Sequence, residues 1–204
     1  MMALRRIRAI RIPRRMPTPH TLDQLIQVYD EAFDPAMCER MIQSFHALAR
    51  FQKQNGRGVR GGLEDSGWTE LDITPLSDPG FRGMVYDTMC RYLERYNATL
   101  GLTIPIPVAE RISELIIKRY RAGTEDNFQP HFDSLGPVCN RYMVFLWYLN
   151  DVEEGGETSF LDIGVDMRPK TGRLVMFPPY WMFQHAARPP ISNDKYILSS
   201  YFLF

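Results

Sequence analysis

The chain has 204 residues, 45% of them hydrophobic and 12% aromatic, and its 24 Lys and Arg residues balance 24 Asp and Glu residues. This composition excludes a disordered chain and predicts a globular protein of one or two domains. A chain of this length buries roughly 70% of the surface that its unfolded form exposes, so it needs neither disulfides nor a structural metal to fold. Any metal that it binds is therefore expected to serve chemistry.

The neutral overall charge hides an asymmetry, because six arginines and no acidic residue lie in the first twenty residues. Without those arginines the chain carries 18 basic side chains against 24 acidic ones. A mildly acidic body repels a phosphate backbone, so we expect no nucleic-acid partner. We interpret residues 1–20 as an Arg-rich tail without catalytic meaning; a transit-like or polyanion-binding arm is the alternative.

No stretch of the sequence approaches about eighteen consecutive apolar residues, so we expect no membrane segment. The cysteines are odd in number and far apart, and none belongs to a Cys-x-x-Cys pair; they are Cys38, Cys90 and Cys139. This pattern is typical of free thiols in a reducing compartment. We therefore predict a cytoplasmic protein, whose oligomeric state the sequence leaves open.

The first half of the chain predicts a helical support over residues 34–100. A short strand is expected over 28–33, followed by a helix over 35–50 whose N-cap is Asp34. A second helix is expected over 79–100, because apolar side chains recur there at three-to-four spacing.

Between the two helices, residues 53–67 hold five glycines and few apolar side chains. This composition predicts a mobile loop that is long enough to be a lid. Arg57 and Arg60 in the loop either close over an anionic or peptide substrate or are simply solvated, and solvation is the favoured interpretation.

The second half changes to short runs of β-branched and aromatic residues that are separated by Gly and Pro. We expect strands at 112–121, 129–133, 141–149, 157–161, 165–168, 173–177, 181–187 and 195–203. Strands in series without intervening helices indicate a mainly β protein with a double-stranded β-helix, or jelly-roll, core over 111–204. Residues 21–204 would then form one domain, with the N-terminal helices packed on one sheet.

The triplet His131-Phe132-Asp133 lies in one of these predicted strands. Residues i and i+2 of a strand project from the same face, so an imidazole and a carboxylate can converge there. Such a triplet is weak evidence alone, and a hydrogen-bonded surface pair is then the favoured interpretation.

His185 adds a second imidazole from the strand-rich half. Alternation places it on the same inward face as Trp181, Phe183 and Ala187. An isolated inward histidine is more often a satisfied core residue than a ligand. Together with the first pair, however, it completes the two imidazoles and one carboxylate that occupy one face of an octahedral ferrous ion.

Lys195 lies ten residues after His185, on a strand whose two faces are both strongly apolar. A lysine directed inward there needs an anionic partner or must lose its charge. Its side chain either reaches solvent from the start of the strand or receives the distal carboxylate of a dianionic cosubstrate. Tyr148, on a neighbouring strand, could donate a second hydrogen bond to that carboxylate.

The order of these residues resembles the prolyl 4-hydroxylase-like branch of the iron(II)- and 2-oxoglutarate-dependent dioxygenases. That family carries His-x-Asp, a distal His, and a Lys or Arg about ten residues beyond it, matched here by His131, Asp133, His185 and Lys195. The flanking segments 116–123 (IIKRYRAG), 141–150 (RYMVFLWYLN), 155–158 (GGET) and 169–172 (PKTG) also match, and 33–42 (FDPAMCERMI) matches more loosely.

The resemblance implies that His131, Asp133 and His185 hold iron(II), while Lys195, with Tyr148, fixes the 5-carboxylate of 2-oxoglutarate. Dioxygen is then the third reactant, and ascorbate is left open as a further cofactor. The implied reaction hydroxylates an aliphatic C–H bond of a peptide or small molecule and releases succinate and carbon dioxide. Tyr120 and Ser199 could border 2-oxoglutarate.

Three tracts depart from the family pattern: 127–141 is short, 53–67 is rich in glycine, and 177–181 reads FPPYW. They surround the substrate, so they leave the metal chemistry in place and the substrate open. The alternatives are a small-molecule tailoring oxygenase that desaturates or cyclises, and a jelly-roll binding module without catalysis.

Overall fold

The computed structural model describes residues 20–59 and 61–204. Residues 1–19, which form almost all of the predicted Arg-rich tail, and Arg60 lie outside these ranges. Within the described residues, no helix is both long and apolar enough to cross a membrane.

Two helices form one layer of the molecule: α1 (Pro35–Ala47) and α2 (Pro79–Leu100). Each begins with an aspartate N-cap followed by proline, an arrangement that was predicted for α1 only. The Asp34 carboxylate accepts the Met37 N–H, and the Asp78 carboxylate accepts the Phe81 N–H, both at 2.9 Å. The prediction of 79–100 is confirmed, while 35–50 runs too far, because the chain turns into a 3-10 helix at Ala49–Phe51.

The larger of two antiparallel sheets carries most of the strands. Its order is β1 (Gln27–Tyr29), β10 (Leu174–Phe177), β7 (Arg141–Tyr148), β12 (Lys195–Leu203), β5 (Ile116–Tyr120), β3 (Gly67–Asp72) and β2 (Lys53–Gly56), and β4 (Arg111–Ile112) pairs with the end of β12. The smaller sheet has the order β6 (Phe128–His131), β11 (His185–Ala187), β8 (Thr158–Phe160) and β9 (Val165–Met167).

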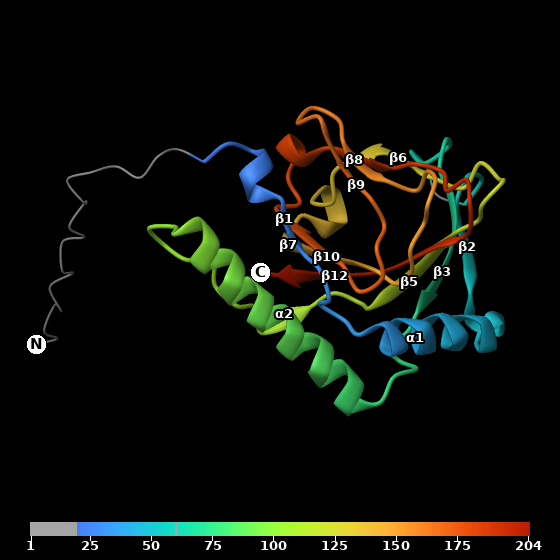
Figure 1. Ribbon diagram of the computed structural model, residues 1–204, viewed down its shortest axis with the longest axis horizontal. Helices are drawn as coiled ribbons and strands as arrows, with labels where there is room; N and C mark the ends of the chain where they lie inside the picture. The colour runs from blue at the N-terminus through green and yellow to red at the C-terminus, as the bar shows by residue number, and fades with distance from the viewer. Residues whose placement is uncertain (1–19, 60) are drawn as a thin grey trace, which may run out of the picture.

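Alternation along the central strand β7 divides the interior into two cores. Phe145 and Trp147 pack with the helices, whereas Val144, Leu146 and Tyr148 pack against the smaller sheet. Figure 1 shows the resulting layers, with α1 and α2 below the strands and β6, β8 and β9 on the opposite side. The predicted jelly-roll core with helices on one sheet is confirmed.

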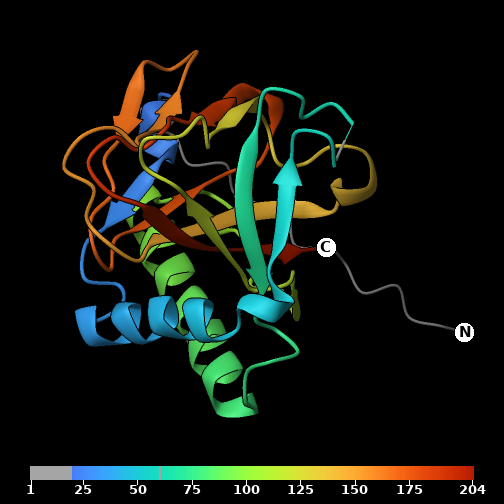
Figure 2. The same ribbon diagram turned by 90° about the vertical axis from the view of Figure 1, so that its right-hand side faces the viewer.

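Part of the predicted loop 53–67 is a hairpin. β2 pairs along its whole length with β3, and the two strands lie side by side at the edge of the larger sheet (Figure 2). The sequence Lys-Gln-Asn-Gly of β2 has no apolar alternation, because this edge strand is held by backbone pairing and not by side-chain burial. Only the segment between the two strands remains a loop.

The predicted strand 181–187 is wrong in its first half. Trp181–Phe183 is a 3-10 turn, closed by the Phe183 N–H on the Tyr180 carbonyl at 2.8 Å. Trp181 is 66% exposed and does not share the inward face of His185. Two prolines directly precede this segment and favour a turn there.

Two further predicted strands are shorter or divided in the structure. The strand expected at 28–33 ends at Tyr29, since the Ala32 and Phe33 N–H groups turn to the Gly172 carbonyl. The strand expected at 112–121 divides into β4 and β5 around residues 113–115.

Candidate metal and 2-oxoglutarate site

His131, Asp133 and His185 converge at one end of the space between the sheets. His131 is the last residue of β6, and its cross-strand partner is His185, the first residue of β11. His131 Nε2 lies 3.7 Å from Asp133 Oδ1, and His185 Nε2 lies 3.5 Å from Asp133 Oδ2. One ligand atom from each residue lies within 4.8 Å of the others.

Asp133 reaches this point by a route that differs from the predicted one. It lies beyond the end of β6, so strand alternation does not orient it. Its N–H instead donates to the Pro179 carbonyl at 3.1 Å. The Pro-rich segment before His185 therefore anchors the loop that carries the carboxylate.

Backbone carbonyls determine which nitrogen of each imidazole faces the carboxylate. His131 Nδ1 lies 2.8 Å from the Gln129 carbonyl, and His185 Nδ1 lies 3.0 Å from the Phe183 carbonyl. A carbonyl can only accept, so Nδ1 of both rings carries the proton and Nε2 presents its lone pair. Two lone pairs and a carboxylate thus face one another without a shared proton, an arrangement that a metal cation neutralises.

The electrostatics favour the protonation states that a metal ligand needs. Burial and the neighbouring His185 lower the pKa of His131 to about 3, against the effect of Asp133. Burial opposes ionisation of Asp133, but His185, His131, Lys118 and the Tyr201 hydroxyl outweigh it, and its pKa is lowered. The Tyr201 hydroxyl donates to Asp133 Oδ1 at 2.9 Å.

Lys195 lies deeper between the sheets, at the start of β12. Its side chain is 0% exposed, and among the described residues its Nζ has no hydrogen-bond partner. The ammonium lies 5.3 Å from the ring centroid of Tyr120 and 5.4 Å from that of Tyr148. Burial lowers its pKa to about 7, although Glu157 opposes this shift. The solvent-directed alternative for Lys195 is wrong.

The comparisons with known proteins agree with this geometry. Residues 115–203 match the family model described as the 2OG-Fe(II) oxygenase superfamily, a segment that contains the three converging residues and Lys195. This segment, which is less than half of the chain, resembles the 2OG-Fe(II) oxygenase superfamily. The resemblance leaves the substrate open.

Prolyl 4-hydroxylases are among the curated proteins that this chain resembles. Subunit alpha-2 from Gallus gallus is 28% identical over 158 residues, which are 69% of this chain and 26% of that protein. Probable prolyl 4-hydroxylase 11 from Arabidopsis thaliana is 36% identical over 87 residues, 39% of this chain and 27% of that one. The chain thus spans about a quarter of the length of these relatives.

Solved prolyl hydroxylases share the fold of this chain. A Pseudomonas putida prolyl-4-hydroxylase superposes with a TM-score of 0.64 at 18% identity, covering 88% of this chain and 92% of that one. A Trichoplax adhaerens prolyl hydroxylase, in complex with a hypoxia inducible factor peptide fragment, gives a TM-score of 0.66 at 12% identity, with coverages of 88% and 84%.

One of the predicted 2-oxoglutarate contacts does not line the cavity between the three converging residues and Lys195. Tyr120, Thr158, Lys195 and Ser199 line it, but Tyr148 does not. The Tyr148 hydroxyl lies 2.7 Å from Thr158 Oγ1 and 3.1 Å from the Met167 carbonyl, so its single proton is already used. In this arrangement Tyr148 has no proton left for a further acceptor, whereas the Thr158 hydroxyl, which the sequence analysis did not single out, lines the cavity.

A groove of about 760 Å³ opens from the converging residues toward solvent, and Leu135, Arg141 and Gly62 lie along it. Its wall near the site is aromatic. The Phe128 ring stacks on the His131 ring, with 3.6 Å between the ring centroids, and on the Trp68 ring, with 4.6 Å between the centroids. This wall shields one side of His131 from solvent.

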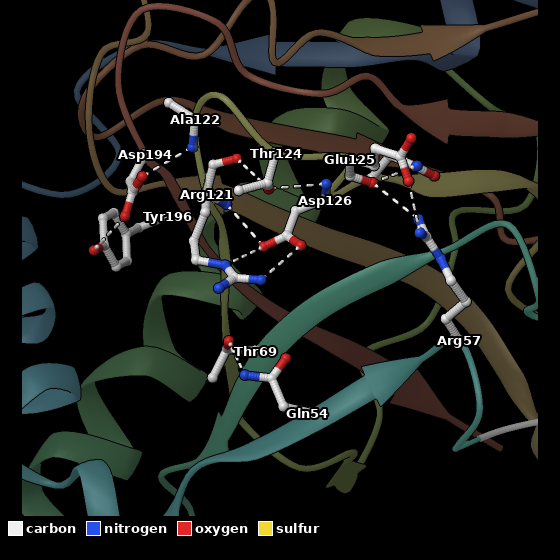
Figure 3. Close-up of polar contacts among 11 residues, drawn as sticks. Gln54, Arg57, Thr69, Arg121, Ala122, Thr124, Glu125, Asp126, Asp194 and Tyr196 are labelled. Atoms are coloured by element: carbon white, nitrogen blue, oxygen red, sulfur yellow. Dashed lines mark hydrogen bonds and ion pairs between the residues drawn. The ribbon is translucent and has the colours of Figure 1, made fainter.

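The Gly-rich segment between β2 and β3 is tied to the strand that carries His131. The Gln129 side chain accepts the Asp65 N–H at 3.1 Å and donates to the Gly62 carbonyl at 2.9 Å. Figure 3 shows Arg57 on Glu125, at 2.7 Å, so this arginine is engaged away from the groove.

The loop between β5 and β6 in turn holds the start of β12. Arg121 Nε donates to Asp126 at 2.9 Å, and the Ala122 N–H donates to Asp194 at 2.9 Å (Figure 3). Asp194 directly precedes Lys195. The loop between β5 and β6 therefore links the strand that carries His131 to the start of β12, where Lys195 lies.

Proposed function

We propose that this chain is an iron(II)- and 2-oxoglutarate-dependent dioxygenase that hydroxylates an aliphatic C–H bond. The observation that carries the proposal is the pairing of two features in one interior. Two imidazoles with fixed Nε2 lone pairs face a carboxylate, and a fully buried ammonium lies in the same cavity. The first suits a ferrous ion with open positions, and the second suits a carboxylate ligand.

In this proposal His131, Asp133 and His185 hold the iron, and Lys195 holds the 5-carboxylate of 2-oxoglutarate. When bound, the iron and 2-oxoglutarate supply oxidation by dioxygen, in which one oxygen atom enters the substrate C–H bond and the other enters succinate, with loss of carbon dioxide.

The chain's own residues position and shield the reactants. Gln129 and Phe183 fix the two imidazole tautomers through their carbonyls, and Tyr201 holds the carboxylate of Asp133. The aromatic rings around Lys195 exclude water, which strengthens its interaction with an anion but offsets part of the gain through desolvation.

The proposed substrate is a peptide or a small molecule that enters by the open groove. The resemblance to prolyl 4-hydroxylases and the peptide named with the Trichoplax enzyme support a prolyl residue in a peptide. A desaturating or cyclising oxygenase would use the same iron ligands.

Succinate formation tests the proposal. The purified chain with iron(II) and 2-oxoglutarate is expected to release succinate, and a panel of proline-containing peptides and free amino acids is scanned for a mass gain of one oxygen. His131→Ala is expected to reduce the rate at least about a hundredfold, whereas His20→Ala, at an exposed histidine, leaves it unchanged. Absence of iron-dependent succinate, or full activity of His131→Ala, would favour the binding-module alternative.

A further inference from the structure

Asp133 is the only one of the three converging residues that lies outside a strand. Its carboxylate faces the two imidazoles about equally, because Oδ1 lies 3.7 Å from His131 Nε2 and Oδ2 lies 3.5 Å from His185 Nε2. Carboxylates bind cations through one oxygen or through both. The two rings therefore do not determine which oxygen, or how many, Asp133 offers to a metal.

The hydroxyl of Tyr201 distinguishes the two oxygens. It lies 2.9 Å from Asp133 Oδ1, and because a carboxylate only accepts, the phenol donates its single proton there. Both residues are buried, with 7% of Tyr201 and 8% of Asp133 exposed, so water competes little for this hydrogen bond. Oδ1 thus has a donor from the protein, while Oδ2 faces the ring of His185.

Tyr201 is itself held by its backbone and by its ring. Its N–H donates to Ser113 Oγ at 3.1 Å, and its carbonyl accepts the Ser113 N–H at 2.9 Å. The guanidinium of Arg141 lies 3.9 Å from the ring centroid, and Arg141 Nη1 donates to the Asp133 carbonyl at 3.3 Å. One arginine thus contacts both the donor and the residue that accepts, which fixes the hydroxyl relative to the carboxylate.

We propose that Tyr201 is a positioning residue for metal binding, whose hydroxyl occupies Asp133 Oδ1 so that Asp133 presents Oδ2 alone. This inference rests on the proposed oxygenase function and adds how the carboxylate ligand is oriented. Two imidazoles and one carboxylate oxygen fill three positions of an octahedral ion and leave three for the reactants. A carboxylate that binds through both oxygens leaves only two.

Cobalt(II) tests this orientation without turnover, because it takes the same kinds of ligand as iron(II) and binds them more tightly. Tyr201→Phe keeps the ring beside Arg141 and removes only the donor. Calorimetry without 2-oxoglutarate is expected to show cobalt(II) binding about tenfold weaker or more, since a lost hydrogen bond to a ligating side chain has an effect of this size. Cobalt(II) binding as tight as in the wild type would overturn the proposal.

The visible absorption of the bound cobalt(II) reports on the coordination itself. The positions and intensities of its bands depend on which atoms surround the ion, so Tyr201→Phe is expected to change them when Oδ1 is released. Weaker binding with an unchanged spectrum would mean that Tyr201 supports the surroundings of the site without orienting Asp133, which contradicts the proposal.

Tyr142→Phe is the matched control for this substitution. Tyr142 is also 7% exposed, and its hydroxyl donates to the Pro107 carbonyl at 2.7 Å, but it lines neither the inner cavity nor the groove. Urea unfolding is expected to show a similar loss of stability in both variants, while Tyr142→Phe keeps the cobalt(II) affinity and spectrum of the wild type. Equal weakening of cobalt(II) binding in both variants would show a general effect of a lost hydroxyl and would refute the assignment.

The wild-type chain separates this proposal from the oxygenase function. If it binds neither cobalt(II) nor iron(II), or forms no iron-dependent succinate, the oxygenase function fails. If it binds the metal and forms succinate, but Tyr201→Phe matches it in cobalt(II) affinity and spectrum, only the assignment to Tyr201 fails.

Discussion

At the scale of single residues, the ammonium of Lys195 links ligand binding to proton binding. In the free chain burial lowers its pKa to about 7, from a usual value of 10.5. A dianion beside Nζ favours the charged form and raises the pKa again. If Lys195 holds the 5-carboxylate as proposed, 2-oxoglutarate is expected to bind together with a proton between about pH 7 and 10.5, with an affinity that falls as the pH rises.

Calorimetry at pH 8 in buffers of different ionisation enthalpy measures this proton directly. We expect uptake of close to one proton for each 2-oxoglutarate bound, and a fall in affinity approaching tenfold per pH unit above pH 8. Lys195→Met is expected to bind weakly and without this uptake. A binding enthalpy that is independent of the buffer would contradict the assignment of the 5-carboxylate to Lys195.

The residues that the sequence located and those that it missed differ in a physical way. His131, His185 and Lys195 belong to an ordered pattern along the chain, and each lies in a segment that was predicted as a strand. Tyr201 contacts Asp133 across a separation of 68 residues, and Gln129 acts partly through its carbonyl. Such contacts depend on strand pairing, so no local pattern could predict them.

At the scale of elements, the segments with strong local signals were predicted best. Helix α2 has an N-cap, an N-terminal proline and a left-handed Gly101 with φ of 58° at its end, and both of its boundaries were predicted correctly. Strand β12 was also predicted with the same first and last residues that the structure shows. Strand β2 has no such signal, because its pairing with β3 is a property of the assembled sheet.

The hairpin of β2 and β3 gives a prediction for the Gly-rich segment that joins them. Gln129→Leu removes the side-chain hydrogen bonds to Gly62, Asp65 and Ser66 but keeps the carbonyl that orients His131. We expect amide hydrogen exchange at Asp65 to accelerate at least about tenfold, because each of the lost bonds contributes roughly 1 kcal/mol to holding the segment.

Gln54→Leu is the matched control for this change. The Gln54 side-chain amide donates to Thr69 at 2.8 Å within the same hairpin (Figure 3), and among the described residues it has no hydrogen bond to the joining segment. Exchange at Asp65 is expected to stay as in the wild type. Equal acceleration in both variants would show that the hairpin as a whole loosens and that Gln129 does not hold the segment.

At the scale of the whole molecule, the larger sheet has a packed interior on each of its two faces. Its helix-facing side packs a continuous apolar core, while its other side shares the space with the smaller sheet and holds the charged groups. Apolar burial on the first side stabilises the fold and offsets the cost of placing Lys195 and Asp133 within it. The pH dependence of stability reports that cost.

The unfolded chain holds its Lys195 proton up to about pH 10.5, whereas the folded chain releases it near pH 7. Between these values the unfolded state binds more protons, so the contribution of Lys195 to the free energy of unfolding rises with pH and is least favourable below pH 7.

Urea unfolding of the chain without ligands measures this change. The free energy of unfolding of Lys195→Met minus that of the wild type is compared at two pH values. This difference is expected to be larger at pH 6 than at pH 10.5, by about 3 to 5 kcal/mol. Lys53→Met, at an exposed lysine, is expected to show no such difference between the two pH values. If Lys195→Met follows the wild type in parallel from pH 6 to 10.5, the buried ammonium does not carry the shifted pKa, and proton-linked binding of 2-oxoglutarate loses its basis.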